Sequence, residues 1–252
     1  MSSPSRNALV TGAASGIGAA IAERLVRAGY AVALLDVAAD EVRGRAGALG
    51  QPHIVADLAD DVSVSAAVTR VPELLPSLDV LVNAAGIGDA RPTAELGLDE
   101  YRRVLAVNLD GMVALTLGLL PLLRASTAAR VLNIGSVQGI TSAADTLAYA
   151  TSKGGVHAFT RSLAVDAAAD GILVNALAPG FVETPMARLA DGSTEYETDW
   201  FRTVYVEHGR VPLRRPAQPD EVAAVAEFFV SPLNTYVTGQ IIPVDGGLGA
   251  TF

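Results

Sequence analysis

Two alternating periodicities constrain the fold of this chain more than any single motif does. Short apolar runs of strand length occur near residues 8–10, 31–35, 53–56, 78–82, 129–134, 172–177 and 240–243. Longer amphipathic stretches lie between most of them, near residues 17–28, 62–75, 98–125, 147–169 and 219–230. Strands that alternate with helices favour a parallel sheet with helices packed on it. The pattern therefore predicts an α/β fold built on seven parallel strands.

The composition gives no sign of a boundary between two domains. Of the 252 residues, 50% are apolar and 18% are charged, and there is no repeat or low-complexity tract, which is typical of a globular chain. Residues 181–215 differ from the rest because they combine charges, aromatic residues and prolines. We therefore predict a single domain over residues 1–252, in which 181–215 form an insertion over the carboxyl edge of the sheet.

Charge and composition exclude several classes of function. The net charge of −9 argues against nucleic acid, whose binding needs a basic face. The absence of cysteine rules out disulfides, thiolate metal sites and a thiol nucleophile. His53, His157 and His208 do not have the spacing of metal ligands, so we predict no metal site. We expect His157 to be a packed helical histidine, whereas His208 could line a pocket.

No segment indicates a membrane span or export. The most apolar stretch, residues 112–123, is interrupted by Thr116, Gly118 and Pro121 and is too short to cross a bilayer. Residues 1–6 are polar and lack the apolar region of a secretory signal. We therefore expect a cytoplasmic protein with no membrane contact.

A glycine-rich turn joins the first expected strand to the first expected helix. It reads Gly12-Ala-Ala-Ser15-Gly16-Ile17-Gly18. Glycines let the backbone approach a ligand closely, and the helix that follows presents free N–H groups to a pyrophosphate. The GxxxGxG spacing departs from the GxGxxG fingerprint of larger dinucleotide-binding domains. A turn built only for tight packing is the alternative.

An acidic residue ends the second expected strand. Asp36 follows Gly18 by eighteen positions, where a carboxylate can accept hydrogen bonds from both hydroxyls of an adenosine ribose. It would repel a 2′-phosphate, and neither Ala14, Ser15 nor Val37 supplies a cation to receive one. The pattern favours NAD over NADP, although a solvated aspartate would look the same in the sequence.

Two further strand ends carry weaker signals. Asp57-Leu58 follows the third strand and could meet the adenine edge. Asn83-Ala84-Ala85-Gly86 follows the fourth, and its small residues permit close approach of a cofactor. A turn without a ligand would have a similar sequence.

A tyrosine and the only lysine of the chain lie one helical turn apart. All seventeen other basic positions are arginine, so Lys153 is an amine that arginine does not replace. Tyr149 and Lys153 are at i and i+4, on one face of the expected helix. A nearby cation favours the phenolate and lowers the pKa of a phenol towards the range of a useful base. The alternative is a solvated pair on a helix surface.

Together these motifs resemble the short-chain dehydrogenase/reductase superfamily, in its single-domain form, over essentially the whole chain. The resemblance implies a Rossmann-type doubly wound parallel sheet of seven strands with helices on both faces. It also implies the residues that contact the cofactor: Gly12, Ser15, Gly16, Ile17, Gly18, Asp36, Val37, Asp57, Leu58, Asn83, Ala84, Ala85, Gly86, Tyr149, Lys153, Pro179, Gly180, Val182 and Thr184. Asn175 matches the same sixth-strand region that holds the nicotinamide.

The resemblance implies a catalytic tetrad. Tyr149 would exchange the hydroxyl proton of the substrate while hydride passes to or from the nicotinamide. Ser136 would orient and polarise the substrate oxygen, and Lys153 would lower the pKa of the phenol and hold the nicotinamide ribose. Asn108 would position a water in a proton relay through Lys153.

The implied function is an NAD-dependent dehydrogenase of a small secondary alcohol or polyol and its ketone. Candidate substrate contacts are Ser136, Gln138, Tyr149, Met186 and Trp200. The alternative is a 3-oxoacyl-[acyl-carrier-protein] reductase, against which Asp36 and Asp170 both speak, the latter because such reductases tend to present a basic docking residue there. A non-catalytic nucleotide-binding protein is a third interpretation. Residues 244–247 match a segment that usually packs in a tetramer interface, so a homotetramer is expected.

Overall fold

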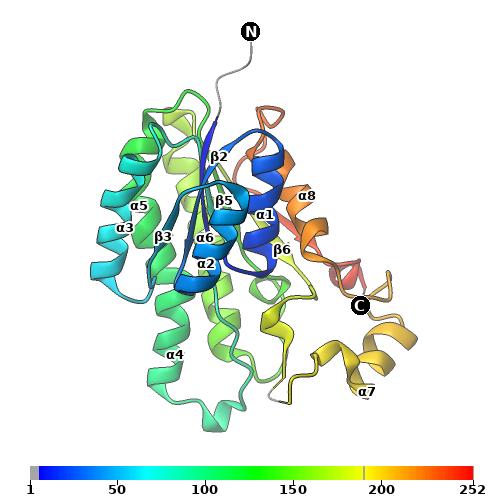
Figure 1. Ribbon diagram of the computed structural model, residues 1–252. Helices are drawn as coiled ribbons and strands as arrows, with labels where there is room; N and C mark the ends of the chain where they lie inside the picture. The colour runs from blue at the N-terminus through cyan, green and yellow to red at the C-terminus, as the bar shows by residue number, and fades with distance from the viewer. Residues whose placement is uncertain (1–5, 190, 252) are drawn as a thin grey trace.

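A computed structural model describes residues 6–189 and 191–251 and shows one parallel sheet (Figure 1). All neighbouring strands pair in parallel, in the order β3-β2-β1-β4-β5-β6-β7. The strands are β1 (Asn7–Thr11), β2 (Ala31–Asp36), β3 (His53–Val55), β4 (Val80–Asn83), β5 (Arg130–Ile134), β6 (Leu173–Pro179) and β7 (Ile241–Val244). The order reverses between β1 and β4, where doubly wound sheets bind their ligands. The predicted Rossmann-type sheet is confirmed.

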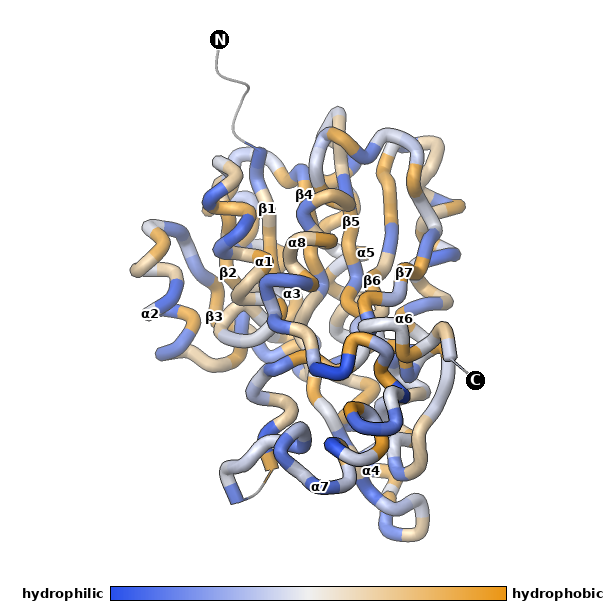
Figure 2. Tube along the Cα trace, turned by 90° about the vertical axis from the view of Figure 1, so that its right-hand side faces the viewer, coloured by the Kyte–Doolittle hydropathy of each residue, from blue (hydrophilic) through white to orange (hydrophobic). Residues whose placement is uncertain are grey.

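Helices cover both faces of the sheet. Successive side chains of a strand point to opposite faces, so each strand contributes residues to the apolar cluster on either side. In β1, Ala8 and Val10 belong to one apolar cluster and Leu9 to the other. The first cluster includes α1 (Gly16–Arg27), α2 (Ala39–Leu49) and α8 (Pro219–Val230). The second includes α3 (Asp61–Leu74), α5 (Gly111–Arg124) and α6 (Leu147–Asp166). Figure 2 shows the apolar strands between more polar helices.

One helix was missed by the sequence analysis. Helix α2 buries only Val42 and Ala46, and it contains Gly44 and Gly47, which weaken both its apolar stripe and its helix propensity. It ends at Gly50, whose φ of 65° is left-handed. Packing of a narrow face against β2 and β3 compensates for this weak local preference.

One helical run of the core is longer than the apolar stretch at residues 112–123 that the sequence analysis considered. Within the described residues, one continuous helical run, Leu98–Arg124, is long and apolar enough to cross a bilayer. It joins α4 (Leu98–Leu105), a π turn (Ala106–Asp110) and α5. In this fold the run is a core helix, because Leu115, Leu119 and Leu123 are fully buried in the cluster on the sheet.

The segment 181–215 lies beyond the carboxyl ends of the strands and contains only short helical turns, at Pro185–Ala187, Glu195–Glu197, Asp199–Phe201 and Arg202–Glu207. Four of its aromatic rings pack edge to face or tilted on one another. They are Phe181, Tyr196, Phe201 and Tyr205. This cluster gives the segment a small core separate from the two sheet faces.

Candidate active site

The glycine turn brings the ends of β1 and β4 into contact. Gly12 has a left-handed φ of 66°, and a Cβ there would lie 2.8 Å from the backbone of Ala85. The hydroxyl of Thr11 accepts hydrogen bonds from the N–H groups of Ala84 and Ala85, both at 3.0 Å. No side chain caps the start of α1 at Ser15, so the first N–H groups of the helix are available to a phosphate. This glycine cradle fits a dinucleotide.

Asp36 lies beside the same turn. Its Oδ2 accepts a hydrogen bond from the N–H of Ala14 at 3.0 Å, and its Oδ1 accepts one from the N–H of Ala38 at 3.0 Å. Each carboxylate oxygen has a further lone pair, so both can still accept from ribose hydroxyls. The neighbouring Val37 is exposed. The structure thus brings Asp36 and the glycine turn together as the sequence predicts.

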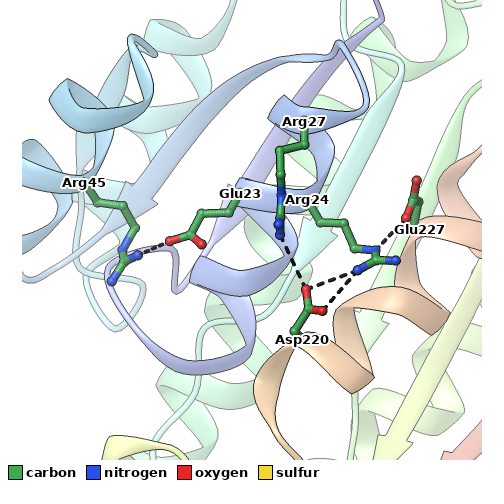
Figure 3. Close-up of polar contacts among 6 residues, drawn as sticks. All are labelled: Glu23, Arg24, Arg27, Arg45, Asp220 and Glu227. Carbon is green, nitrogen blue, oxygen red and sulfur yellow. Dashed lines mark hydrogen bonds and ion pairs between the residues drawn. The ribbon is translucent and has the colours of Figure 1, made fainter.

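A cation also lies near this turn, although the sequence analysis found none there. The Nε of Arg45, on α2, donates to the carbonyl of Ala14 at 3.1 Å, and its guanidinium pairs with Glu23 on α1 (Figure 3). Arg45 went unnoticed because α2 was not predicted. Its ion pair with Glu23 offsets the positive charge that it brings to this turn.

Three candidates from β3 and β4 turn out to have structural contacts. The Oδ1 of Asp57 accepts from the N–H of Ala59 at 2.9 Å, and Leu58 is buried. The side chain of Asn83 points into the core, where its Nδ2 donates to Asn133 at 2.8 Å and to Thr116 at 3.0 Å. The side chain of Asn83 is thus held inside the protein, and the predicted approach of a cofactor to Asn83–Gly86 would be along the backbone.

Gly86 marks the point where two predicted catalytic side chains meet. A Cβ on Gly86 would lie 3.2 Å from the Oδ1 of Asn108 and 3.4 Å from the Nζ of Lys153. Lys153 is buried and its ammonium donates to the carbonyl of Ile134, at the end of β5, at 2.8 Å. An amine on α6 is thereby anchored between the ends of β4 and β5.

Asn108 lies in the π turn, where the change of helical period places a buried side chain against the segment after β4. Its Oδ1 accepts from the N–H of Ile87 at 2.8 Å, while its Nδ2 donates to the carbonyl of Ile87 at 2.9 Å and to the hydroxyl of Ser152 at 3.1 Å. The side chain is engaged with protein at both ends. It holds the Gly86–Gly88 strand end in place, and Ser152, which we did not predict, links it to α6.

Ser136 follows β5 and begins a short helical turn. It is buried, and its hydroxyl accepts from the N–H of Gln138 at 3.1 Å. The hydroxyl also interacts with the phenol of Tyr149, and the Nζ of Lys153 lies 5.7 Å from the centre of the Tyr149 ring. Ser136, Tyr149 and Lys153 therefore share one small volume at the carboxyl edge of the sheet.

Burial has the largest influence on the ionisation of this group. It raises the pKa of Tyr149; the hydrogen bond with Ser136 lowers that pKa, and the carboxylate of Glu195 raises it. Burial also lowers the pKa of Lys153 to about 8. We expected the lysine to lower the pKa of the phenol, but in the protein alone desolvation outweighs any such influence. Glu195, in the segment 181–215, is a third residue, after Arg45 and Ser152, that the sequence analysis did not predict.

The segment after β6 packs against the glycine turn. The Cγ2 of Thr184 lies 3.2 Å from where a Cβ on Gly16 would be, so this segment crosses the glycine turn. A Cβ on Gly180 would lie 2.9 Å from Asp245, which packs Pro179-Gly180 against the carboxyl-terminal segment. Val182 is held at both its N–H and its carbonyl by the hydroxyl of Tyr196. Asn175, by contrast, only joins β6 to residues 237–240.

A cleft of about 370 Å³ lies between the segment after β5 and the start of α6, with Thr93 from the segment after β4, and none of Asn108, Ser136, Tyr149 and Lys153 lines it. It is lined by Thr93, Gln138, Gly139, Ile140, Ser142, Ala143, Ala144, Asp145, Thr146, Leu147, Ala150 and Thr151. Asp145 is the only ionisable lining residue, and the buried Oε1 of Gln138 has no hydrogen-bond partner. Met186 and Trp200 do not line this cleft. Met186 lies against Gly88, and Trp200 is largely exposed beside Tyr205.

The described residues contain no group of three histidine, aspartate or glutamate side chains arranged to hold a metal ion.

Comparison with known proteins gives consistent matches along the chain. A family model described as enoyl-(acyl carrier protein) reductase matches residues 12–249. The chain is 35% identical over 246 residues to a 3-oxoacyl-[acyl-carrier-protein] reductase of Aquifex aeolicus, covering 95% of this chain and 96% of that protein. It is 36% identical over 245 residues to a galactitol 2-dehydrogenase (L-tagatose-forming) of Cereibacter sphaeroides, covering 95% and 93%.

A solved structure agrees with these relatives. The crystal structure of a 3-ketoacyl-(acyl-carrier-protein) reductase from Brucella melitensis, complexed with NADH, superposes with a TM-score of 0.87 at 30% identity. The match covers 96% of this chain and 98% of that chain.

Proposed function

The chain belongs to the short-chain dehydrogenase/reductase superfamily and is an oxidoreductase that acts on CH–OH groups, and we propose that it interconverts a small secondary alcohol or polyol and its ketone with NAD. The observation that carries the proposal is the convergence of Ser136, Tyr149 and Lys153 at one sheet edge, beside a glycine turn that holds Asp36. The reaction needs a base for the hydroxyl proton and a site for the dinucleotide, and both are present.

In oxidation, Tyr149 as phenolate takes the hydroxyl proton of the substrate. Ser136 donates to the same substrate oxygen and keeps it next to the phenol. When bound, NAD would supply the redox chemistry as the acceptor of the hydride that leaves the carbinol carbon. The Lys153 ammonium, fixed on the carbonyl of Ile134, favours the phenolate by its positive charge and would hold the nicotinamide ribose. Asn108 keeps the strand end at Gly86 open beside Lys153, next to the position that a relay water would need.

The choice of NAD rests on the glycine turn. Asp36 presents acceptors to ribose hydroxyls and negative charge to a 2′-phosphate, and the nearby cation, Arg45, is already paired with Glu23. A preference for NAD favours oxidation of the alcohol as the direction of the reaction. In this proposal the cofactor is bound by the candidate residues of the glycine turn, of the ends of β2, β3 and β4, and of residues 179–184, together with Tyr149 and Lys153.

The proposed substrate is neutral. The cleft carries hydroxyls, an amide and one carboxylate but no cation among its lining residues, and Glu195 adds negative charge near Tyr149. Such a site disfavours carboxylates and phosphates, whereas the hydroxyls of a polyol can bond to it. In this proposal residues 181–215 cover the substrate, and Met186, which lies against Gly88, contacts it.

A 3-oxoacyl-[acyl-carrier-protein] reductase is the second candidate, favoured by the similarity to the Aquifex aeolicus protein. Cofactor choice does not separate the two, because the Brucella melitensis reductase was crystallised with NADH. The charge at the site where a carrier protein would dock does separate the two functions. Asp170 pairs with Arg124 at 2.7 Å, so the surface at Asp170 offers an ion pair rather than a free cation to an acidic carrier protein.

Absorbance at 340 nm tests these alternatives. We expect NADH to form from NAD with secondary alcohols or polyols and little NADH to be consumed with acetoacetyl thioesters. The reverse pattern would favour the reductase. A protein that binds NADH but turns over neither panel would be the third, non-catalytic alternative.

We further propose a cytoplasmic homotetramer. The edge strand β7 is only half-buried, and Leu117 on the outer face of the core helix is 52% exposed. Both surfaces would be covered by neighbouring subunits. Light scattering at micromolar concentration should give about four times the mass of one chain, and a monomer would contradict the proposal.

A further inference from the structure

His157 is a buried titratable side chain that the proposed mechanism does not use. It lies on α6, one turn beyond Lys153 and two turns beyond Tyr149, and its side chain is only slightly accessible. Its Nε2 has no hydrogen-bond partner in the described residues. Burial lowers the pKa of His157, opposed by a hydrogen bond with the backbone of Gly139, so the ring is kept neutral near physiological pH.

The imidazole occupies the space in which two glycines would carry side chains. A Cβ on Gly135 would lie 2.2 Å from the Nε2 of His157, and a Cβ on Gly139 would lie 2.6 Å from its Cε1. These glycines are the two ends of the segment 135–139, which contains Ser136 and Gln138. No residue larger than glycine fits at either end while the ring is in place.

The same segment is tied to β6 at one end and closed by a turn at the other. The N–H of Gly135 donates to the carbonyl of Leu177 at 2.8 Å, and the N–H of Gly139 donates to the carbonyl of Ser136, within the segment, at 2.9 Å. The ammonium of Lys153 holds the preceding residue, Ile134, from α6. The ring of His157 is a further contact of α6 with this segment, and it lies against both Gly135 and Gly139.

We infer that His157 is a positioning residue, whose ring acts as a spacer between α6 and residues 135–139 and so fixes the hydroxyl of Ser136 relative to the phenol of Tyr149. Loss of the ring leaves room for the segment to shift towards α6. A displacement of about 1 Å at a reacting group can cost on the order of 10²-fold in rate. The activity part of this inference rests on the proposed function, and the packing part does not.

The packing is tested by the melting temperatures of paired variants of the full chain. Gly135→Ala and His157→Ala should each lower Tm, and the double variant should lose less than the sum, because the new methyl group fills the vacated space. Apart from the ring, the nearest atom to that methyl is the Leu177 carbonyl, at 3.2 Å. If the single variant Gly135→Ala does not fold, a double variant that does fold supports the spacer equally, because removal of the ring has then rescued the alanine. Additive losses, or a double variant that does not fold, would overturn the spacer.

Gly139→Ala is the matched control. Its methyl group would also meet the carbonyl of Lys153 at 2.7 Å, and removing the ring does not relieve that contact. His157→Ala should therefore rescue the variant at 135 and not the one at 139. Equal rescue of both would show a general loosening of the segment and would overturn the inference.

The effect on Ser136 is tested by steady-state kinetics. His157→Ala should lower kcat about tenfold or more with nearly unchanged KM for NAD, and it should cause no further loss in a Ser136→Ala background. Leu163→Ala, a buried change on the same helix, should lower Tm but preserve kcat. Unchanged kcat in His157→Ala, or a further loss in the Ser136→Ala background, would refute the positioning role. If the unmodified protein oxidises no alcohol, the proposed function fails, and the melting experiment still decides on the spacer.

Discussion

Two regions of this protein act on the same phenol with opposite sign. The sheet edge, formed by the ends of β1, β2, β4 and β5 together with α6, lowers the pKa of Tyr149 through the hydroxyl of Ser136. The proposed covering segment, residues 181–215, raises that pKa through the carboxylate of Glu195. The sheet edge is held by hydrogen bonds between residues far apart in sequence, whereas the covering segment packs on its own aromatic cluster. We therefore expect substitutions at the sheet edge to change turnover and cofactor choice. Substitutions in residues 181–215 should change the pH profile or the KM for the alcohol.

The largest effect is expected from the sheet edge itself. Tyr149→Phe removes the group that accepts the substrate proton and should lower turnover at least about 10²-fold. Binding of NADH, followed by its fluorescence, should persist because the glycine turn is untouched. Activity close to that of the unmodified protein would refute the role of the phenol.

A comparable effect on cofactor choice is expected at the end of β2. Hydrogen bonds to a charged group are worth roughly 1.5–3 kcal/mol each, so Asp36 should favour NAD over NADP by at least about 10²-fold in kcat/KM. Asp36→Ala should reduce this ratio mainly by weakening NAD.

Steady-state kinetics with each cofactor measures the ratio. Adding Val37→Arg should begin to reverse the preference by supplying a partner for the phosphate. Equal use of both cofactors by the unmodified protein would show that Asp36 does not bind the ribose.

The pH dependence of oxidation compares the two regions directly. Activity rises with pH as the phenolate forms, so a higher pKa of Tyr149 moves the rise to higher pH. Ser136→Ala removes an interaction that lowers the pKa and should move the residual activity to higher pH. Glu195→Gln removes a charge that raises the pKa and should move it to lower pH.

Profiles of log kcat against pH, measured with saturating NAD, give both shifts. Glu197→Gln is a control of the same charge on the outer side of the same turn. Shifts of the same sign for Ser136→Ala and Glu195→Gln would contradict the opposition of the two regions.

The smallest effect is expected from the outer part of the covering segment. Trp200 is 63% exposed and contacts Tyr205 by its ring edge, outside the cleft. Trp200→Ala should change KM for the alcohol by only a few-fold and leave the pH profile in place. A large loss of kcat would show that the covering segment takes part in the chemistry.

The contrast between local and tertiary signals also explains what could be predicted from the sequence. The seven strands, the glycine turn, Asp36 and the Tyr149–Lys153 pair were predictable because each depends on a local period or spacing. Helix α2 was not, because its narrow apolar face is stabilised by packing on β2 and β3. Because α2 was not predicted, Arg45 was not considered as a cation near the glycine turn. Its position, nine residues after Asp36, is the one signal in the sequence that could have suggested it.

Other site features depend on which way a side chain points, and no sequence pattern decides that. Asn83 bonds inside the core to Asn133 and Thr116, which lie on other elements. The π turn at Asn108 and the proximity of Glu195 to Tyr149 likewise arise only when distant segments meet. Trp200 was chosen for its size and aromatic character, and the fold places it away from the cleft.

The burial of Lys153 has a practical consequence for spectroscopy and labelling. Because this side chain is the only lysine, lysine labelled with ¹⁵N at Nζ and added to the growth medium would give a single side-chain resonance, located at the proposed catalytic centre. Its chemical shift would follow ionisation of the ammonium and the arrival of cofactor without any assignment by mutagenesis. Reagents that modify accessible amines would find this amine shielded, so the rate of its modification would measure how often α6 and the ends of β4 and β5 separate.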